Sequence, residues 1–282
     1  MTHPVAIIPY TNMAPLQVFG PPQGCRFVPM VPRESITALL EKRVIAAAVP
    51  VGGLPALDSA VDLLGPFGIA ARERSMSVLL FSKRPFADIP PDARFRLTSE
   101  SASSVRLLYL LHGYRNGFKK KPTSAGNGRS ADGELLIGDA ALLMRKSHRE
   151  NRSHEYPFVT DLAEEWFAMH SLPFVFARWV IRKDAPGTAR RALENWLDEF
   201  RVNEFDLIHR AAPPAARSLG LPLQEVLDYF RTVRRVLDQD DLAGQERFLT
   251  DLELLKESQK AQAGLFAQRK AKSVIFAFLT DH

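Results

Sequence analysis

The order of apolar and amphipathic segments in the first 85 residues constrains the fold of this chain most strongly. Val5–Pro9 and Val44–Val51 are short apolar runs that end at proline or glycine, as buried strands do. Between them, Val31–Arg43 has apolar residues at helical spacing, and Ser77–Ser82 follows as a third apolar strand. This alternation of strand, helix and strand is typical of a parallel sheet with helices on its faces.

The middle of the chain indicates a second α/β unit. Arg94–Leu97 has the pattern of a short strand, and a serine-rich turn leads from it into a helix over Ser103–Gly113. Glu134–Ile137 is a further short strand, and Gly138 follows it at the start of another helix. The Gly-, Ser- and Lys-rich segment 117–133 is typical of a mobile surface loop.

Two long apolar stretches, Ser77–Lys83 and Phe174–Arg182, flank this second unit. We interpret them as crossover strands between two lobes, each a mixed sheet flanked by helices. The predicted fold is therefore α/β and two-lobed, with residues 1–84 and 176–282 in lobe one and residues 85–175 in lobe two. Ligands bind between such lobes, at the carboxyl ends of the strands. One continuous doubly wound sheet is the alternative arrangement.

The chain after Ile181 is predicted to be helical, because its apolar positions recur every three or four residues. These helices are assigned to lobe one. They are expected at Thr188–Phe205, Ala211–Ser218, Leu223–Leu237 and Leu242–Thr280.

Charge and composition limit the classes of partner. The net charge is +5, but the basic side chains are spread along the chain without the interleaved aromatic residues of a nucleic-acid surface. Such a surface would still attract small anionic metabolites. No run approaches the ~20 apolar residues of a membrane span, and the N-terminus does not have the pattern of a secretory signal. With Cys25 as the only cysteine, we expect a cytoplasmic protein that has no nucleic-acid or membrane partner.

The loop after the first strand carries the first candidate site residues. Tyr10 and Asn12 lie there between Pro9 and Pro15, at the carboxyl edge of the predicted sheet. The amide of Asn12 can donate to and accept from a hydroxyl or a carboxylate. An asparagine between two prolines also makes an ordinary turn, and spacing alone does not separate the two interpretations.

Serine residues mark the second candidate region. Thr98–Ser104 follows a predicted strand and opens a helix, where free N–H groups and hydroxyls can bind an anion. One serine is enough to cap the helix, so the additional hydroxyls favour a binding role for Ser103 and Ser104. Ser75 and Ser77 lie two residues apart at the start of the third strand and therefore face the same way.

Gly138 and Asp139 lie at another junction between a strand and a helix. Gly138 allows a close approach of backbone and substrate, and Asp139 either caps the helix or faces the cleft. The sequence has no nucleophile elbow, no phosphate-binding loop, no dinucleotide fingerprint and no metal-ligand spacing. Neither a metal nor another cofactor is therefore predicted.

Six segments of the chain occur together in a recognisable order. They are IPYTNMAP, AAVPVG, RSMSVLLFSKRP, LTSESASSVRLLYLL, LLIGDAAL and DLAEEWFAMHSLPFVFARWV. Together they resemble the chorismate dehydratase family of the futalosine route to menaquinone, over roughly residues 5–250. The Leu-Ile-Gly-Asp-Ala-Ala-Leu segment and the Glu-Glu-Trp to Leu-Pro-Phe-Val-Phe-Ala block are the most specific parts of the match.

The resemblance implies a type II periplasmic-binding-protein-like fold and the loss of water from chorismate, giving 3-[(1-carboxyvinyl)oxy]benzoate. The asparagine of the first loop is the family residue most closely tied to catalysis, which implies a catalytic role for Asn12. Matched positions imply that Ser77 is also catalytic and that Ser103 and Ser104 bind substrate. Thr11 departs from the family, which usually has leucine there.

Two other functions remain open from the sequence. A solute-binding or effector-sensing protein would bind a small carboxylate in the same cleft and turn nothing over. The related 1,4-dihydroxy-6-naphthoate synthase shares the fold, but its usual Cys-Pro-Asn-Asp start is absent here. For the dehydratase, the enolpyruvyl carboxylate of the substrate is a candidate base, because no protein base stands out in the motifs.

Overall fold

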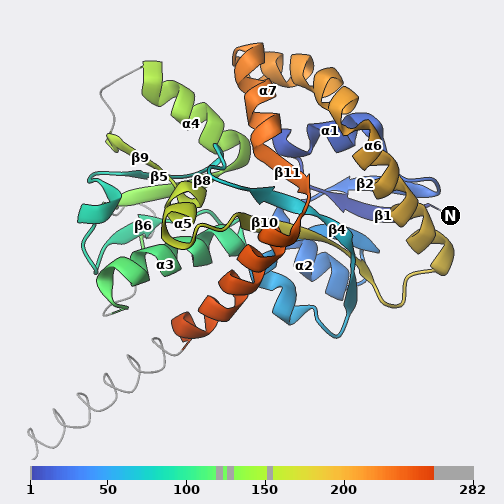
Figure 1. Cartoon of the computed structure of the whole chain (residues 1–282), viewed down its shortest axis with the longest axis horizontal. Helices are drawn as coiled ribbons and strands as arrows, with labels where there is room; N and C mark the ends of the chain where they lie inside the picture. The colour runs from blue at the N-terminus through green and yellow to red at the C-terminus, as the bar shows by residue number, and fades with distance from the viewer. Residues whose placement is uncertain (1, 119–122, 126–129, 151–154, 257–282) are drawn as a thin grey trace, which may run out of the picture.

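The computed structural model describes residues 2–118, 123–125, 130–150 and 155–256, which form two lobes built on two β-sheets (Figure 1). The first sheet has the strand order β11-β4-β10-β3-β1-β2, and the second has the order β7-β6-β8-β5-β9. We call the parts around these sheets lobe one and lobe two. The strands of lobe one are β1 (His3–Ile7), β2 (Cys25–Pro29), β3 (Ala46–Pro50), β4 (Val61–Ala71), β10 (Phe174–Arg182) and β11 (Val233–Val236). Those of lobe two are β5 (Val78–Ser82), β6 (Arg94–Arg96), β7 (Thr123–Ser124), β8 (Gly133–Ile137) and β9 (Phe158–Asp161).

Both sheets combine parallel and antiparallel pairs, as the sequence predicted. In the first sheet, β1 lies parallel to β2 and β3, while β10 runs antiparallel to β3 and β4. The strand, helix and strand predicted near the N-terminus are therefore present. In the second sheet, β5 is antiparallel to β8 and β9, and β6 is parallel to β7 and β8.

Helices cover both faces of the first sheet. The largest apolar core lies between this sheet and α1, α6 and α7, and it contains Trp179, Trp196 and Phe200. A smaller core lies on the other face, under α2. None of the helices within the described ranges is both long and apolar enough to cross a membrane. The helices are α1 (Ala14–Phe19), α2 (Pro32–Leu40), α3 (Ala102–Asn116), α4 (Gly138–Glu150), α5 (Leu162–His170), α6 (Gly187–Leu219) and α7 (Leu223–Thr232), with short 3₁₀ turns η1 (Thr11–Met13), η2 (Val51–Ala56) and η3 (Phe86–Asp88).

The sheet pairing moves the lobe boundaries away from residues 84 and 176. β5, which the sequence assigned to lobe one, pairs with β8 and β9 of the second sheet. The chain therefore crosses between the sheets at residues 72–77, before β5, and again at residues 171–173, before β10. β5 is not a crossover strand, because all its pairing lies within lobe two.

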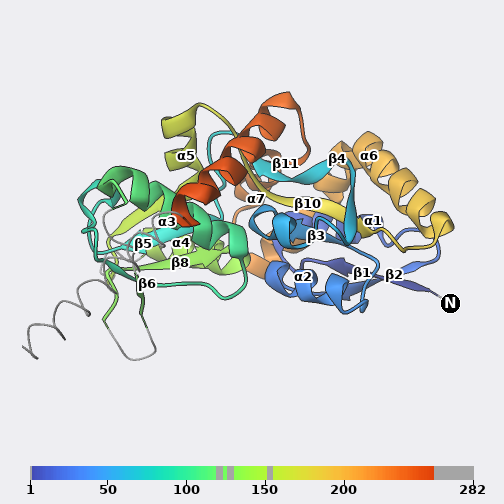
Figure 2. The same cartoon turned by 90° about the horizontal axis from the view of Figure 1, so that it is seen from below.

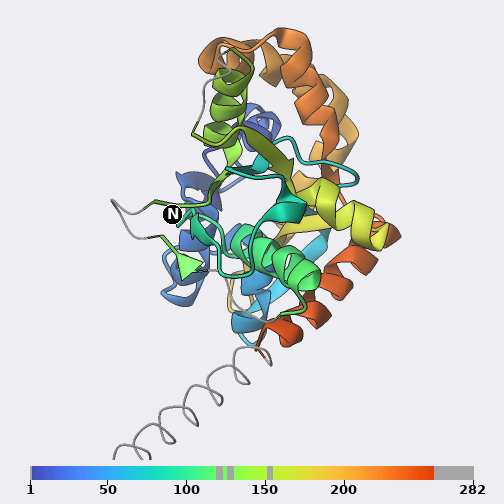
Figure 3. The same cartoon turned by 90° about the vertical axis from the view of Figure 1, so that its left-hand side faces the viewer.

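The last described helix, residues 239–256, also differs from its assignment to lobe one. Its buried residues Phe248 and Leu252 belong to the apolar core that α3 and α5 form in lobe two. Figures 2 and 3 show this helix, in red, lying beside α3. The predicted continuation of this helix to Thr280, and the lysines of the loop over 117–133, lie outside the described residues.

Two helix predictions near the C-terminus were wrong. The break expected at residues 206–210, between the helices at Thr188–Phe205 and Ala211–Ser218, is not present, because Leu207 and Ile208 are buried in the core of lobe one and α6 is continuous there. α6 also continues through Pro213 and Pro214, because the alanines on either side of them are buried in the same core, and this packing outweighs the lost backbone hydrogen bonds. The helix expected over Leu223–Leu237 ends at Thr232, and β11 follows. Val233 and the next residue pair with the end of β4, so the free edge of the sheet decides the structure of this segment.

Candidate functional site

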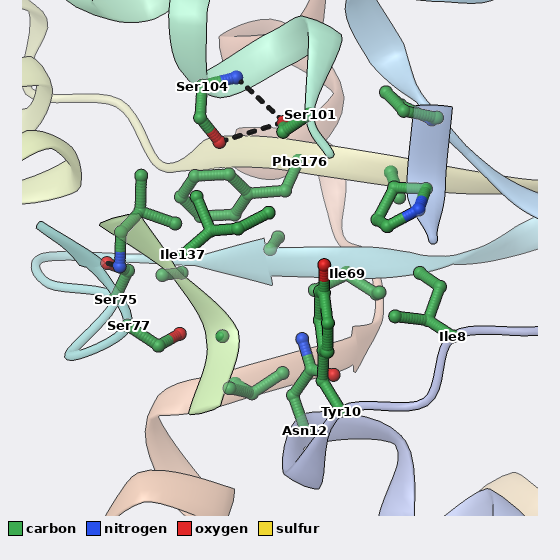
Figure 4. A pocket seen from close by; sticks show the side chains of 18 residues that line it. Ile8, Tyr10, Asn12, Ile69, Ser75, Ser77, Ser101, Ser104, Ile137 and Phe176 are labelled. Carbon is green, nitrogen blue, oxygen red and sulfur yellow. Dashed lines mark hydrogen bonds between the residues drawn. The ribbon is translucent and has the colours of Figure 1, made fainter. Parts of the chain in front are cut away.

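A pocket with about 560 Å³ of space, part of it open to solvent, lies between the two lobes (Figure 4). Its lining includes the loop after β1 and the carboxyl ends of β3, β4 and β8, which is where an open sheet places its ligands. Of the residues that the sequence singled out, Tyr10, Asn12, Ser77, Ser104 and Gly138 line this pocket. Residues from far apart in the chain thus meet at one place.

Tyr10 joins the two lobes across the pocket. Its hydroxyl donates to Oε2 of Glu100 at 2.6 Å. Burial, and then the hydrogen bond to Glu100, raise the pKa of Tyr10 above its ordinary value, so the phenol stays protonated. The ring packs on Gly138, which has a φ of +57°, and a Cβ at that position would lie 2.8 Å from the ring. Only glycine therefore fits against Tyr10 without strain.

Asn12 lies in η1, directly after the loop of Tyr10. Its backbone carbonyl accepts hydrogen bonds from Nε and Nη2 of Arg235, at 3.2 and 2.9 Å. Its side-chain Oδ1 is buried and has no hydrogen-bond partner in the described structure. A buried acceptor without a partner is costly, and a ligand hydroxyl in the pocket would satisfy it.

The crossover at residues 72–77 is held by one buried carboxylate. Asp161 Oδ2 accepts from the backbone N–H groups of Ser75 and Met76, at 2.9 and 2.7 Å, and Oδ1 accepts from the hydroxyl of Ser75. Met76 has a φ of +62°, a strained value for a residue with a side chain. These bonds hold the turn in the conformation that brings Ser77 to the pocket.

The hydroxyl of Ser77 has one defined partner, the hydroxyl of Tyr229 at 3.0 Å. Tyr229 is fully buried, and burial raises its pKa, so it remains protonated and donates to Ser77. Ser77 is then left with its own hydrogen to donate to a ligand. Figure 4 shows Ser77 and Asn12 among the side chains around the pocket.

Ser101 and Ser104 form the lobe-two side of the pocket. Ser101 caps α3: its Oγ accepts from the backbone N–H of Ser104 at 3.1 Å and its hydroxyl donates to Ser104 Oγ at 3.0 Å (Figure 4). The hydroxyl hydrogen of Ser104 therefore remains for a ligand at the start of α3, where the helix dipole favours negative charge. Ser101 is therefore the residue that caps α3, and the side chain of Ser104 does not take part in the cap.

Ser103 and Asp139 do not line the pocket but tie its parts together. Ser103 is fully buried, accepts from the N–H of Gly52 at 3.0 Å and donates to the carbonyl of Phe176 at 3.1 Å. Asp139 accepts from the N–H of Thr11 at 2.9 Å. Both join lobe two to elements of lobe one, and the two bonds of Ser103 use its hydroxyl as acceptor and as donor without a ligand.

The lining of the pocket is otherwise apolar. It includes Ile8, Ile69, Val78, Ile137 and Phe176, and among its described residues there is no Asp, Glu, His, Lys, Arg or Cys. The polar groups are thus neutral hydrogen-bond donors and acceptors between apolar walls. Such an arrangement can orient a polar ligand and stabilise charge that develops on it. Across the part of the chain that the structure describes, no three His, Cys, Asp or Glu side chains gather as a metal site.

Several residues that shape the site were not found from the sequence. Tyr229 and Arg235 come from the segment that was expected to be one helix, so nothing indicated that they return to the first loop. The sequence predicts a helix over Asp161–His170, and Asp161 does cap α5, but nothing in this pattern indicates its contacts with Ser75 and Met76. Glu100 lies within the serine-rich segment but was not singled out. The sequence signal that could have indicated Glu100 as a site residue was its position directly before the helix cap Ser101.

Comparison with known proteins points to one pathway. The protein-family model described as "Menaquinone biosynthesis" matches residues 4–253. A chorismate dehydratase of Thermus thermophilus is 32% identical over 257 residues, which cover 87% of this chain and 93% of that protein.

Solved structures agree with the fold at much lower identity. A protein of Archaeoglobus fulgidus superposes with a TM-score of 0.65 at 14% identity, covering 90% of this chain and 98% of the other. The alkanesulfonate-binding protein SsuA of Xanthomonas axonopodis pv. citri, bound to MOPS, gives 0.60 at 11% identity, covering 92% and 93%. A Candida albicans protein described as having the generic periplasmic binding protein fold gives 0.56 at 11% identity, covering 89% of each chain. The predicted two-lobed binding-protein fold is confirmed.

Proposed function

Because the chain belongs to the menaquinone biosynthesis family, whose model spans residues 4–253, we propose that it is a chorismate dehydratase. The proposed reaction is the conversion of chorismate to 3-[(1-carboxyvinyl)oxy]benzoate and water, which makes the enzyme a carbon–oxygen lyase. The Thermus thermophilus relative, similar over 87% of this chain, carries that name. The match extends through all the elements that form the pocket.

The chemistry requires little from a protein. The C3–H and C4–O bonds of the cyclohexadiene ring break, the proton and the hydroxyl leave as one molecule of water, and the ring becomes aromatic. Neither an oxidant nor a reductant is needed for this balance. The protein must hold the ring, assist departure of the hydroxyl and keep other water away.

One observation carries the assignment of roles: donors and an acceptor that the protein leaves unused meet in a pocket with apolar walls. In our proposal, the hydroxyl of Ser77 and the amide of Asn12 donate to the departing C4 hydroxyl, while the unpartnered Oδ1 of Asn12 accepts from it. Ser104 donates to a carboxylate of the substrate at the start of α3. Tyr10 and Gly138 form the side of the pocket against which the ring packs.

The proton acceptor in this proposal is the enolpyruvyl carboxylate of the substrate itself. The described lining offers no carboxylate, imidazole or amine. Tyr10 does not serve as the base, because its raised pKa keeps the phenol protonated and its hydroxyl already donates to Glu100. A carboxylate on the substrate is next to C3 and enters an apolar pocket, where it becomes a stronger base than in water.

The test is to incubate the purified protein with chorismate, with and without an excess of chelator, and to follow the products by chromatography and mass spectrometry. The dehydratase produces an aromatic acid one water lighter than chorismate in both cases. A folded protein that binds chorismate and leaves it unchanged would instead be a solute-binding or effector-sensing protein. A cytoplasmic location stays a prediction, which fractionation of cells expressing the protein tests.

A further inference from the structure

A second, larger groove lies next to the pocket. It spans about 1900 Å³ of space, part of it open to solvent, and its sides come from α2, η2, α3 and the helix over 239–256. Ser101 lines both the pocket and the groove. Pro32 lines the pocket, and the next residue, Arg33, lines the groove. The groove and the pocket therefore adjoin each other at Ser101 and at the start of α2.

Two arginines in this groove have no acidic partner. Arg33 and Arg106 form no ion pair within the described structure, whereas the other charged side chains of the lining, Glu253 and Lys256, pair with each other at 2.6 Å. The side chain of Arg106 makes one hydrogen bond, from Nη1 to the carbonyl of Ala102 on its own helix at 3.3 Å. Most of the N–H groups of both guanidinium groups remain available.

The surroundings of Arg106 are unfavourable for a cation. Burial lowers the pKa of Arg106, and the like charge of Arg33 lowers it further. The guanidinium lies over Gly52, where a Cβ would be 3.1 Å from Nη1. Arg33 is in the first turn of α2, where the helix dipole disfavours positive charge. An anion bound between the two side chains would offset each of these costs.

The groove also supplies the charge that the pocket lacks. Chorismate carries two carboxylates, while the described residues that line the pocket are all neutral. The groove, which shares Ser101 with the pocket, is lined by two arginines that form no ion pair within the described structure. Residues with hydroxyl groups also line this groove: Thr37, Thr98, Ser99, Ser101, Tyr109 and Ser124.

We propose that Arg33 and Arg106 form a docking subsite that binds one carboxylate of a small dicarboxylate at the mouth of the pocket. The identity of the natural ligand rests on the proposed function, but the binding chemistry does not. The pair captures the dianion as it enters and holds its outer carboxylate, while the ring and the other carboxylate occupy the pocket.

The experiment measures the binding of isophthalate, a benzene ring with two carboxylates in 1,3 positions that cannot lose water, and of benzoate, which has only one. Wild-type protein is expected to bind isophthalate at least about tenfold more tightly than benzoate, because only isophthalate has a second carboxylate to form a charge-assisted hydrogen bond with the arginines. Arg106→Gln and Arg33→Gln should each remove most of this preference and reduce its dependence on salt. If chorismate is the substrate, kcat/KM falls by a similar factor and kcat changes little.

The matched control is Arg115→Gln, which removes the same charge from α3 at a residue that pairs with Glu165, outside the groove. It should keep the preference for isophthalate. Arg33 is exposed, so its variant will fold even if that of Arg106 does not. An unchanged preference in folded Arg33→Gln, or an equal loss in the control, would overturn the proposal. Absence of turnover with intact isophthalate binding would refute only the dehydratase function.

Discussion

The guanidinium of Arg235 donates two hydrogen bonds to the backbone carbonyl of Asn12, although the two residues are 223 positions apart in the chain. The same side chain donates from Nη1 to Glu204 and to the carbonyls of Phe230 and Val233. Arg235 is 3% exposed and has no direct access to the pocket lining. It therefore acts as a positioning residue, which fixes η1 against β11 and so fixes Asn12.

Arg235→Lys should lower kcat by roughly 10–100-fold, because a lysine cannot hold the Asn12 carbonyl from two directions and small displacements of reacting groups are costly. KM should change little, and the free energy of unfolding should fall by about 1–3 kcal/mol, since buried carbonyls lose donors. Steady-state kinetics well below the melting temperature separates the two effects. Arg234→Lys is the control, because this neighbouring residue pairs with Asp238 and the buried Asp241 and not with Asn12. Equal kcat in both variants would make Arg235 purely structural.

Asn12→Asp should fold normally and lose turnover by about 10²–10³-fold, the usual cost of one preorganised donor. Aspartate keeps the shape but replaces the NH₂ donor with a carboxylate that repels an anionic substrate. Kinetics beside a thermal melt measures both properties. Asn203→Asp, an exposed change on α6 with the same charge difference, should leave turnover intact. Near-normal turnover of Asn12→Asp would show that the loop is only a turn and move attention to Ser77.

Single replacements of Ser103 and Ser104 should have different effects. Ser103→Ala leaves the Gly52 N–H and the Phe176 carbonyl without their partner, so it should lower the free energy of unfolding by about 1–3 kcal/mol. Ser104→Ala retains the cap from Ser101 and should weaken substrate binding roughly tenfold with little effect on stability. Denaturant unfolding and ligand titration on both variants test this division. The opposite pattern would place Ser103 in the site.

Stability should decrease as the pH falls below about 6.5. His112 Nε2 donates to the carbonyl of Pro90 and its Nδ1 is buried without a partner, so a second proton on the ring would have no acceptor. Burial lowers the pKa of His112 from its ordinary 6.5, although the Pro90 bond opposes this. The unfolded chain therefore takes up a proton that the folded protein does not, and each pH unit between the two pKa values costs at most about 1.4 kcal/mol.

His112→Gln removes this titration and retains an N–H donor toward Pro90. Urea unfolding at pH 7.5 and 5.5 should show a smaller loss of stability in this variant than in the wild type. Some loss will remain, because burial also lowers the pKa of His170. His209→Gln, at an exposed position on α6, should behave like the wild type. An identical pH dependence in His112→Gln would exclude His112 as the cause.

The sequence predicted elements whose apolar pattern is local. The helix expected from Ser103 is α3, because the serine cap and the apolar spacing both lie within the segment itself. β4 was missed, since Gly65, Pro66 and Gly68 interrupt its apolar pattern. Gly68 is needed there because a Cβ would lie 2.5 Å from the carbonyl of Ala177 on β10. That requirement belongs to the neighbouring strand and cannot be seen along the chain.

The same distinction applies to the site. Asn12, Ser77 and Ser104 could be selected because polar residues at strand ends and helix starts are visible in a single sequence. The roles of Ser101 and Ser104 could not be separated, because either hydroxyl could serve as the cap. Arg235 and Tyr229 contact the site only after β11 completes the edge of the first sheet. Their contribution depends on a pairing with β4 that no local pattern indicates.

The bonds that join the lobes have a consequence for the rate of ligand exchange. Tyr10 to Glu100, Thr11 to Asp139, Gly52 to Ser103 and the Arg33 N–H to the Glu100 carbonyl all run from one lobe to the other. A hinge opening wide enough to free a ligand must break at least these four, which alone cost roughly 2–6 kcal/mol if each contributes its usual net amount. The aromatic product should therefore leave slowly after fast chemistry, and a burst of product in the first turnover would reveal the delay.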